Sequence, residues 1–316
     1  MKLNLKKMLG LVAPIPLALG GCSTTSEAKQ DVNESAVVET TPATTGDGSK
    51  PAIWVAKDAD TTIYMFGTFH LIKPGTQWFN EAVKDAYDSS DTLVTEIPDP
   101  KEDAAAQTMA MKYMTSSDGK KLSERLAPDQ LTKYKAYLAA NNLPFEAFEQ
   151  FDPWAAGITA TLMQYMKKGI TAEAGAEKVI GADAAASKKQ HIALETADEQ
   201  MQWMDSMPMT EQVEGLMSIV EDDGKADELI DKMVIAWNGG KPEGLAELIN
   251  SEFAKTPATA KALLYDRNAR WADWIEKRME TPGTVFMAVG AGHLAGKDSV
   301  QDYLAKKNIK SERINY

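Results

Sequence analysis

Two of the three histidines in the chain stand in matching contexts that lie far apart. His70 and His293 each follow an apolar run through the pattern Gly-x-x-His-Leu, which begins at Gly67 in the first copy and at Gly290 in the second. Glycine permits a sharp turn or a close backbone approach where a strand ends, so the pattern predicts an imidazole just beyond each strand. One such pattern is a weak signal, but two copies favour a shared site. The alternative is a pair of unrelated surface histidines.

Two glutamates occupy the last positions of two further apolar runs, Glu96 after Leu93-Val94-Thr95 and Glu195 after Ile192-Ala193-Leu194. Ligands of open α/β sheets bind outside the carboxyl ends of the strands. If these strands are parallel, both glutamates and both repeated histidines converge on one rim. The alternative is that each glutamate meets solvent or sits beside a helix start, since 196–199 reads as a helix capping box.

This set of side chains is typical of a metal site. Two neutral imidazoles, those of His70 and His293, with one of the two strand-end carboxylates suit Zn²⁺, Mn²⁺, Fe²⁺ or Co²⁺. The metal would lower the pKa of a bound water, and the second glutamate could take the proton as general base. The same residues also allow a route without metal, in which a histidine is the general base and a glutamate orients it. The sequence leaves both routes open.

A polar cluster at 265–271 precedes the second histidine pattern and is expected on a helix that reaches the rim. Arg267 could clamp a substrate carboxylate or steady a developing oxyanion, and Asn268 could donate a hydrogen bond. The alternative is an ordinary solvated face on which Asp266 and Arg270 form an i,i+4 pair. The third histidine, His191, lies at a strand start and is expected to be structural or exposed.

Strand-like runs stand towards both ends of the folded part, and long helical stretches fill the middle. We expect strands over 52–57, 61–66, 92–97, 192–195, 284–289 and 312–316, with 58–60 as the turn of a hairpin. We expect helices over 80–89, 101–115, 128–141, 153–167, 173–188, 198–206, 209–221, 225–238, 243–250 and 257–280. This order predicts an α/β fold, with α+β as the alternative, built on a mixed sheet covered by helices. The methionines of 201–217 are expected to be core residues rather than metal or haem ligands.

The first 21 residues read as a lipoprotein signal peptide, with a positive start, an apolar run and Leu19-Gly20-Gly21 before Cys22. Cys22 is the only cysteine, so lipidation, with acyl chains such as palmitate, would consume the only thiol. Residues 22–50 are rich in Ser, Thr, Glu and Ala, which favours a disordered linker. Residues 51–316 then form one domain of the usual size for an α/β protein.

Charge and anchor together restrict the partners. Three of the 34 basic residues and none of the 46 acidic ones lie in the signal peptide, so the mature chain would carry −15. Such a surface repels nucleic acid, and none is expected as a partner. Membrane contact would come through the lipid anchor. Ser23 after the lipidated cysteine is similar to an outer-membrane sorting pattern, so we expect a location in the cell envelope, on the outer membrane facing the periplasm.

From Ile53 to the C-terminus the chain resembles the TraB/GumN family, whose relatives include the Tiki-type membrane-tethered metalloproteases and, more distantly, EreA-like erythromycin esterases and ChaN-like proteins. The resemblance rests on Tyr64–His70, Val94–Glu96, Phe151–Trp154, Gly175–Glu177, Leu194–Gln200, Asp266–Asn268 with Trp271, and Val289–Leu294. It implies an α/β fold with a helical elaboration. For the Tiki-type relatives it implies a divalent-metal-dependent peptidase. On that pattern His70, Glu96 and His293 are metal candidates, with Glu195, Arg267 and Asn268 around them.

The sequence therefore predicts a membrane-tethered envelope hydrolase, a peptidase dependent on Mn, Co or Zn that acts on peptides or proteins of the envelope. A second class is open: a non-catalytic lipoprotein that binds peptide signals or haem iron on the same rim. Because family membership alone does not fix an activity, the geometry of the site has to decide between them.

Overall fold

The structure is a computed structural model that describes residues 48–70, 72–98, 104–167, 172–221, 225–254 and 256–316. The expected signal peptide, the lipidation site Cys22 and most of the linker lie outside these residues. The division of the chain at residues 21 and 50 therefore stays a prediction.

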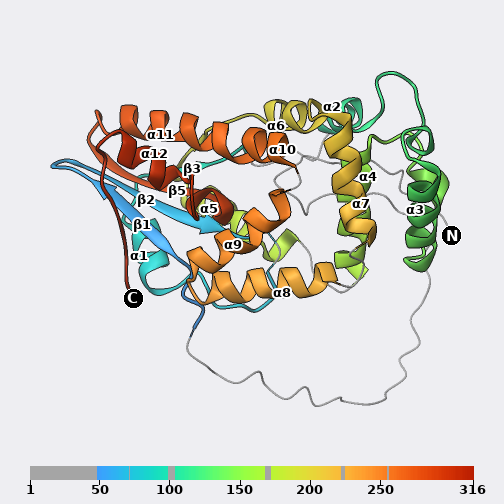
Figure 1. The fold of residues 1–316 in the computed structure, drawn as a ribbon. Coiled ribbons are helices and arrows are strands. Elements are labelled where there is room, and N and C mark those ends of the chain that lie inside the picture. The colour runs from blue at the N-terminus through green and yellow to red at the C-terminus, as the bar shows by residue number, and fades with distance from the viewer. Residues whose placement is uncertain (1–47, 71, 99–103, 168–171, 222–224, 255) are drawn as a thin grey trace, which may run out of the picture.

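A six-stranded mixed sheet forms the centre of the domain (Figure 1). Its strand order is β4-β3-β5-β2-β1-β6, and β4, β3, β5 and β2 run parallel, whereas β1 is antiparallel to both of its neighbours. The strands are β1 (Ile53–Lys57), β2 (Thr61–Thr68), β3 (Thr92–Thr95), β4 (Gln190–Ala193), β5 (Gly283–Gly290) and β6 (Ser311–Arg313). The expected α/β fold is confirmed, and so is the hairpin, because Asp58 N donates to Thr61 O between β1 and β2.

Helices make up most of the remainder. They are α1 (Glu81–Asp88), α2 (Ala104–Met114), α3 (Pro128–Ala140), α4 (Pro153–Lys167), α5 (Ala176–Ser187), α6 (Ala197–Asp205), α7 (Met209–Glu221), α8 (Lys225–Asn238), α9 (Pro242–Phe253), α10 (Pro257–Ala260), α11 (Asp266–Arg278) and α12 (Val300–Lys306). Four of them begin at a proline, which lacks the backbone N–H that the first helical turn leaves unpaired. These prolines are why the sequence placed the helix starts accurately.

Both faces of the sheet are covered, because the central strands alternate their apolar side chains between two cores. On β5, Phe286 and Ala288 face a core shared with α1, α5, α8 and α9. Val285, Met287 and Val289 face the opposite core, shared with α11 and α12. Figure 1 shows α11 and α12 on one side of the sheet and α8 and α9 on the other. Burial on both faces explains why these strands read as continuous apolar runs.

A third core lies away from the sheet, among α2, α3, α4, α6 and α7. Met201, Met204 and Met217 are buried in it, as expected for methionines that fill an irregular helical interface. These five helices form a lobe beside the sheet, and the segment after β4 leads from the sheet directly into α6.

The expected helix over 257–280 is interrupted. Between α10 and α11 the backbone forms one π-helical segment, η5 (Lys261–Tyr265), in which Asp266 N donates to Lys261 O five residues earlier. Such segments are rare inside helices and are frequent at functional sites. η5 ends at Tyr265, two residues before Arg267, so it influences the direction from which this side chain enters the rim.

Candidate functional site

The parallel strands bring the four singled-out side chains to the same edge of the sheet. His70 lies two residues beyond β2, Glu96 one beyond β3, and Glu195 two beyond β4. His293 lies in a short 3-10 helix, η6 (Ala291–Leu294), that follows β5. Because β2, β5, β3 and β4 are successive parallel neighbours, their carboxyl ends form one rim, as the sequence predicted.

The glycine of each histidine pattern allows a close approach at this rim. A Cβ on Gly67 would lie 3.0 Å from both Cα and Cβ of Ala291, so a side chain there would push η6 away from the end of β2. A Cβ on Gly290 would lie 3.1 Å from Glu96 Oε1, and the backbone N–H of Gly290 donates to that oxygen at 2.7 Å. The two glycines therefore hold η6 and Glu96 against the strand ends.

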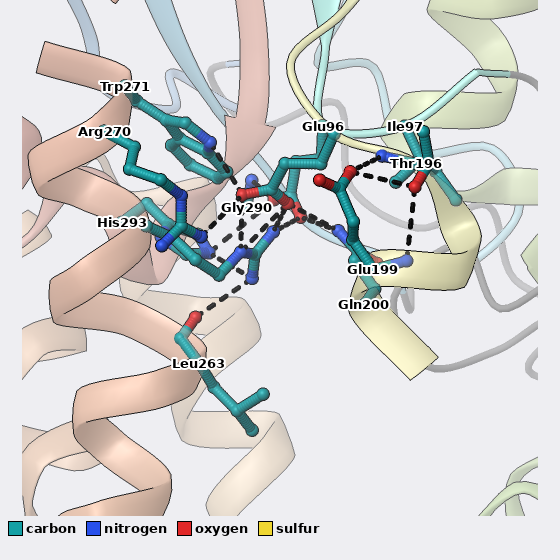
Figure 2. A network of polar contacts seen from close by, with 12 residues as sticks. Glu96, Ile97, Thr196, Glu199, Gln200, Leu263, Arg270, Trp271, Gly290 and His293 are labelled. Atoms are coloured by element: carbon teal, nitrogen blue, oxygen red, sulfur yellow. Dashed lines mark hydrogen bonds and ion pairs between the residues drawn. The ribbon is translucent and has the colours of Figure 1, made fainter. Parts of the chain in front are cut away.

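Arg267 lies at the centre of the cluster and connects its members. Figure 2 shows the network around Glu96, Gln200 and His293. Its Nε donates to Glu195, and its Nη2 donates to both Glu96 and Glu195. Its Nη1 donates to the carbonyl of Leu263 at 2.9 Å and contacts His293 Nε2 at 3.2 Å. A guanidinium has five N–H donors, and these contacts account for all five. Arg267 thus holds the two carboxylates together and has no donor left for a substrate in this arrangement.

The two carboxylates are deeply buried and fully hydrogen-bonded. The side chains of Glu96 and Glu195 are 7% and 3% exposed. Gln200 Nε2 bridges them at 3.2 and 3.1 Å, and Trp271 Nε1 donates to Glu195 at 2.8 Å. Burial alone would raise the pKa of Glu96, but the guanidinium of Arg267, the two histidines and the Gly290 N–H together outweigh it and hold that pKa well below its usual range. Glu96 is therefore ionised at any physiological pH.

His293 is held as a neutral imidazole of one tautomer. Because arginine only donates, His293 Nε2 accepts from Arg267, and Nδ1 carries the proton that it donates to Asn268 Oδ1 at 2.6 Å. Asn268 Nδ2 donates to the carbonyl of Asp298 at 2.8 Å, which fixes the orientation of the amide. Burial and the neighbouring Arg267 lower the pKa of His293 to about 3. An imidazole with so low a pKa is a weak general base near pH 7.

His70 differs from His293 in both exposure and charge. Its side chain is 30% exposed, and its Nδ1 lies 3.0 Å from Glu177 Oε2 at the start of α5. Burial opposes protonation of this ring, but the Glu177 carboxylate outweighs it and raises the pKa of His70. A histidine that can reach solvent, is oriented by a carboxylate and has a pKa above 6.5 is suited to proton transfer near neutral pH.

All six residues predicted for the site therefore lie at the rim, and the structure adds others that the sequence reasoning did not single out. Gln200 and Trp271 stand in the runs that carry the family resemblance, but neither their spacing nor their chemistry marked them as partners of Glu195. Glu177 stands in a third such run. Of the remaining expectations, Asp266 pairs with Lys261 at 2.6 Å, and Arg270 approaches Glu195 instead. His191 lies in β4, where its Nε2 contacts Thr95 Oγ1 at 2.7 Å.

The donor set does not form a metal cage in this arrangement. The described part of the chain holds no group of three or more His, Cys, Asp or Glu side chains placed to share one ion. The reason lies in Arg267, whose Nη1 contacts the lone pair of His293 Nε2 and whose Nη2 contacts Glu96. A cation bound by His293 and Glu96 would have to displace these two contacts.

In this α/β fold the carboxyl ends of the parallel strands bring histidines, glutamates and one buried arginine together at one rim. The chain belongs to the TraB/PrgY/gumN family, whose family model matches residues 52–313 and so covers nearly the whole folded region. No significant match was found among curated proteins or among solved structures. No helix in the described ranges is both long and apolar enough to cross a membrane.

Proposed function

We propose that this member of the family is a hydrolase of the cell envelope that cleaves peptides or proteins at the rim. The observation that carries the proposal is the pairing of His70 with Glu177 beside a buried, fully hydrogen-bonded cluster of charges. Buried clusters of this kind fix the geometry of a site, and groups with perturbed pKa values are typical of catalytic clefts. The partly exposed His70 supplies the group that can exchange protons with a water.

In the route that the geometry favours, the water is activated by His70. Glu177 Oε2 lies 3.0 Å from Nδ1, and its negative charge favours a proton on that nitrogen, which leaves Nε2 of the neutral ring to take a proton from the water. The water oxygen attacks the peptide carbonyl carbon. The same Nε2 then gives its proton to the leaving amine nitrogen as the C–N bond breaks, which returns the ring to its starting state. Positioned acid-base catalysis of this type contributes about 10²- to 10⁴-fold in rate.

The second route uses Mn²⁺, Co²⁺ or Zn²⁺ held by His70, Glu96 and His293. It is supported by the ionised state of Glu96 and by the unprotonated Nε2 of His293, which are the forms that bind metals. A bound metal would supply Lewis-acid activation of water, with Glu195 as the candidate base. Against it stands Arg267, which has to leave both ligands first.

One experiment separates these possibilities. The purified full-length protein is incubated with a random peptide library, with chelator or with added Mn²⁺, Co²⁺ or Zn²⁺, and cleavage is read by mass spectrometry. We expect cleavage that persists in chelator. Cleavage only with added metal, together with binding of about one equivalent that is lost in a His70→Ala, His293→Ala variant, would establish the metal route. Tight retention of peptides or haem without turnover in every condition would instead support the binding role and overturn the proposal.

The proposed location rests on the sequence around Cys22. A lipid on this residue, followed by the linker to residue 50, would tether the domain to the membrane, and a flexible-coil linker would have an r.m.s. span of roughly 30 Å between the lipid and the start of the domain. We expect cells that are given radiolabelled palmitate to incorporate the label into this chain. The labelled chain should be found in the membrane fraction. A Cys22→Ser variant should lose the label, and retention of label in that variant would remove the anchor from the proposal.

A further inference from the structure

Arg270 is a positively charged residue at the rim whose guanidinium N–H donors are available to a ligand. It lies on α11 one helical turn beyond Arg267, and its side chain is 48% exposed, compared with 7% for Arg267. Among the described residues its ion-pair partner is Glu195, but Nη2 and Oε1 are 3.6 Å apart, which is too long for a hydrogen bond. Because Glu195 already accepts from Arg267, Trp271 and Gln200, it does not depend on this contact.

Trp203 on α6 holds the Arg270 guanidinium in place. The guanidinium carbon lies 4.6 Å from the centroid of the half-buried Trp203 ring, and that of Arg267 lies 5.7 Å from the same ring. An arginine stacked on an aromatic face keeps its N–H donors in the plane of the guanidinium, where they stay free to form a two-pronged pair with a carboxylate. Figure 2 shows Arg270 on α11 at the margin of the network, beside Trp271.

The charge of the chain makes such a local cation significant. The chain carries a formal charge of −12, so an anionic substrate gains no attraction from the protein as a whole. Arg267 cannot supply the attraction, because its donors are occupied by Glu96, Glu195, His293 and the Leu263 carbonyl. Arg270, and not Arg267, is therefore the arginine that can bind an anionic group of the substrate at this rim.

We propose that Arg270, stacked on Trp203, binds a carboxylate of the substrate and so selects peptides with a carboxylate close to the bond that is cleaved. This inference deepens the proposed hydrolase function and rests on it for the cleavage step. The carboxylate can be the free C-terminus of a peptide or an acidic side chain. Both present two coplanar oxygens to the guanidinium.

The test measures binding, so that it can be read even if no cleavage occurs. The full-length protein is titrated calorimetrically with one hexapeptide in four forms: free acid or C-terminal amide, each with Glu or Gln at the fifth position. We expect one of the two carboxylates to tighten binding by about tenfold or more, as for a charged hydrogen-bonded pair. A preference for acid over amide identifies the C-terminus, and a preference for Glu over Gln identifies the side chain.

The variants assign the preference to Arg270. Arg270→Gln should abolish it, and Trp203→Leu should weaken it. Lys277→Gln removes the same charge from an exposed position on the same helix and should leave it unchanged. If Arg270→Gln retains the preference, or if the wild-type protein has none, the proposal is wrong. Cleavage of the peptides without any such preference would overturn this inference alone. Arg270-dependent binding without cleavage would overturn the hydrolase function alone.

Discussion

Replacement of Arg267 by methionine is expected to lower the free energy of unfolding by about 3 to 5 kcal/mol, the range observed when one partner of a buried ion pair is removed. Methionine fills much of the same space, so the loss reflects charge rather than a cavity. Without the guanidinium, Glu96 and Glu195 are two buried carboxylates that face each other with one amide, Gln200, between them. The expected change is large because every member of the cluster contacts Arg267 or one of its partners.

The pH dependence of this loss separates it from a simple packing defect. In the wild-type protein the lowered pKa of Glu96 stabilises the fold above about pH 4.5, and that stability is lost as the pH falls through the folded-state pKa. In Arg267→Met the burial of Glu96 is no longer offset by the guanidinium, so the pKa of Glu96 should instead be raised. The variant should then gain stability relative to wild type as the pH falls from 8 to 5.

Chemical denaturation of both proteins across this pH range measures the effect, with Arg270→Met as the matched control. The Arg270 side chain is half-exposed and its ion pair is long, so the control should lose no more than about 1 kcal/mol. Equal losses for the two variants, or a loss in Arg267→Met that does not change with pH, would contradict the assignment of Arg267 as the centre of the cluster.

The second large effect is expected on turnover. His70→Ala should lower kcat/KM for a cleaved peptide by about 10²- to 10⁴-fold, because it removes the group that exchanges the proton with water. The variant should remain folded, since the His70 side chain is 30% exposed. Unchanged turnover in His70→Ala would remove this histidine from the mechanism.

A second variant, Glu177→Gln, tests whether Glu177 raises the pKa of His70. Because Glu177 raises the pKa of His70, the amide should allow the ring to lose its proton at lower pH. The acidic limb of the pH-rate profile should therefore move to lower pH, while the maximal rate falls less than in His70→Ala. His191→Gln serves as the control, because His191 contacts Thr95 rather than the rim cluster. If the acidic limb of the pH-rate profile does not move in Glu177→Gln, a group other than His70 controls that limb.

The sequence predicted the architecture well where local signals were strong. Apolar runs located all six strands to within a few residues, and prolines marked the starts of α3, α4, α9 and α10. The capping box at Thr196 was also correct, since Thr196 Oγ1 accepts from Glu199 N and Glu199 accepts from Thr196 N. The π segment was not predicted, because Lys261–Tyr265 has the composition of an ordinary helix.

The sequence indicated which residues lie at the rim, but not the contacts between them. Repeated patterns and strand-end positions were enough to bring His70, Glu96, Glu195 and His293 to one rim, because parallel strands end on the same side. The sequence could not tell that one guanidinium would use all its donors on its neighbours, since that depends on distances across four elements. The pairing of His70 with Glu177 was invisible for the same reason, because the two residues are 107 positions apart in sequence.

The π segment before α11 makes the length of the chain there as important as its composition. A π turn holds one residue more than an α turn. A deletion of one residue within Lys261–Tyr265 would replace the π turn by an α turn and so change how Arg267, Asn268 and Trp271 are presented to the strand ends, whereas most exchanges of side chains in the segment would keep the π turn. This stretch is therefore expected to tolerate substitution in evolution and to resist insertion and deletion.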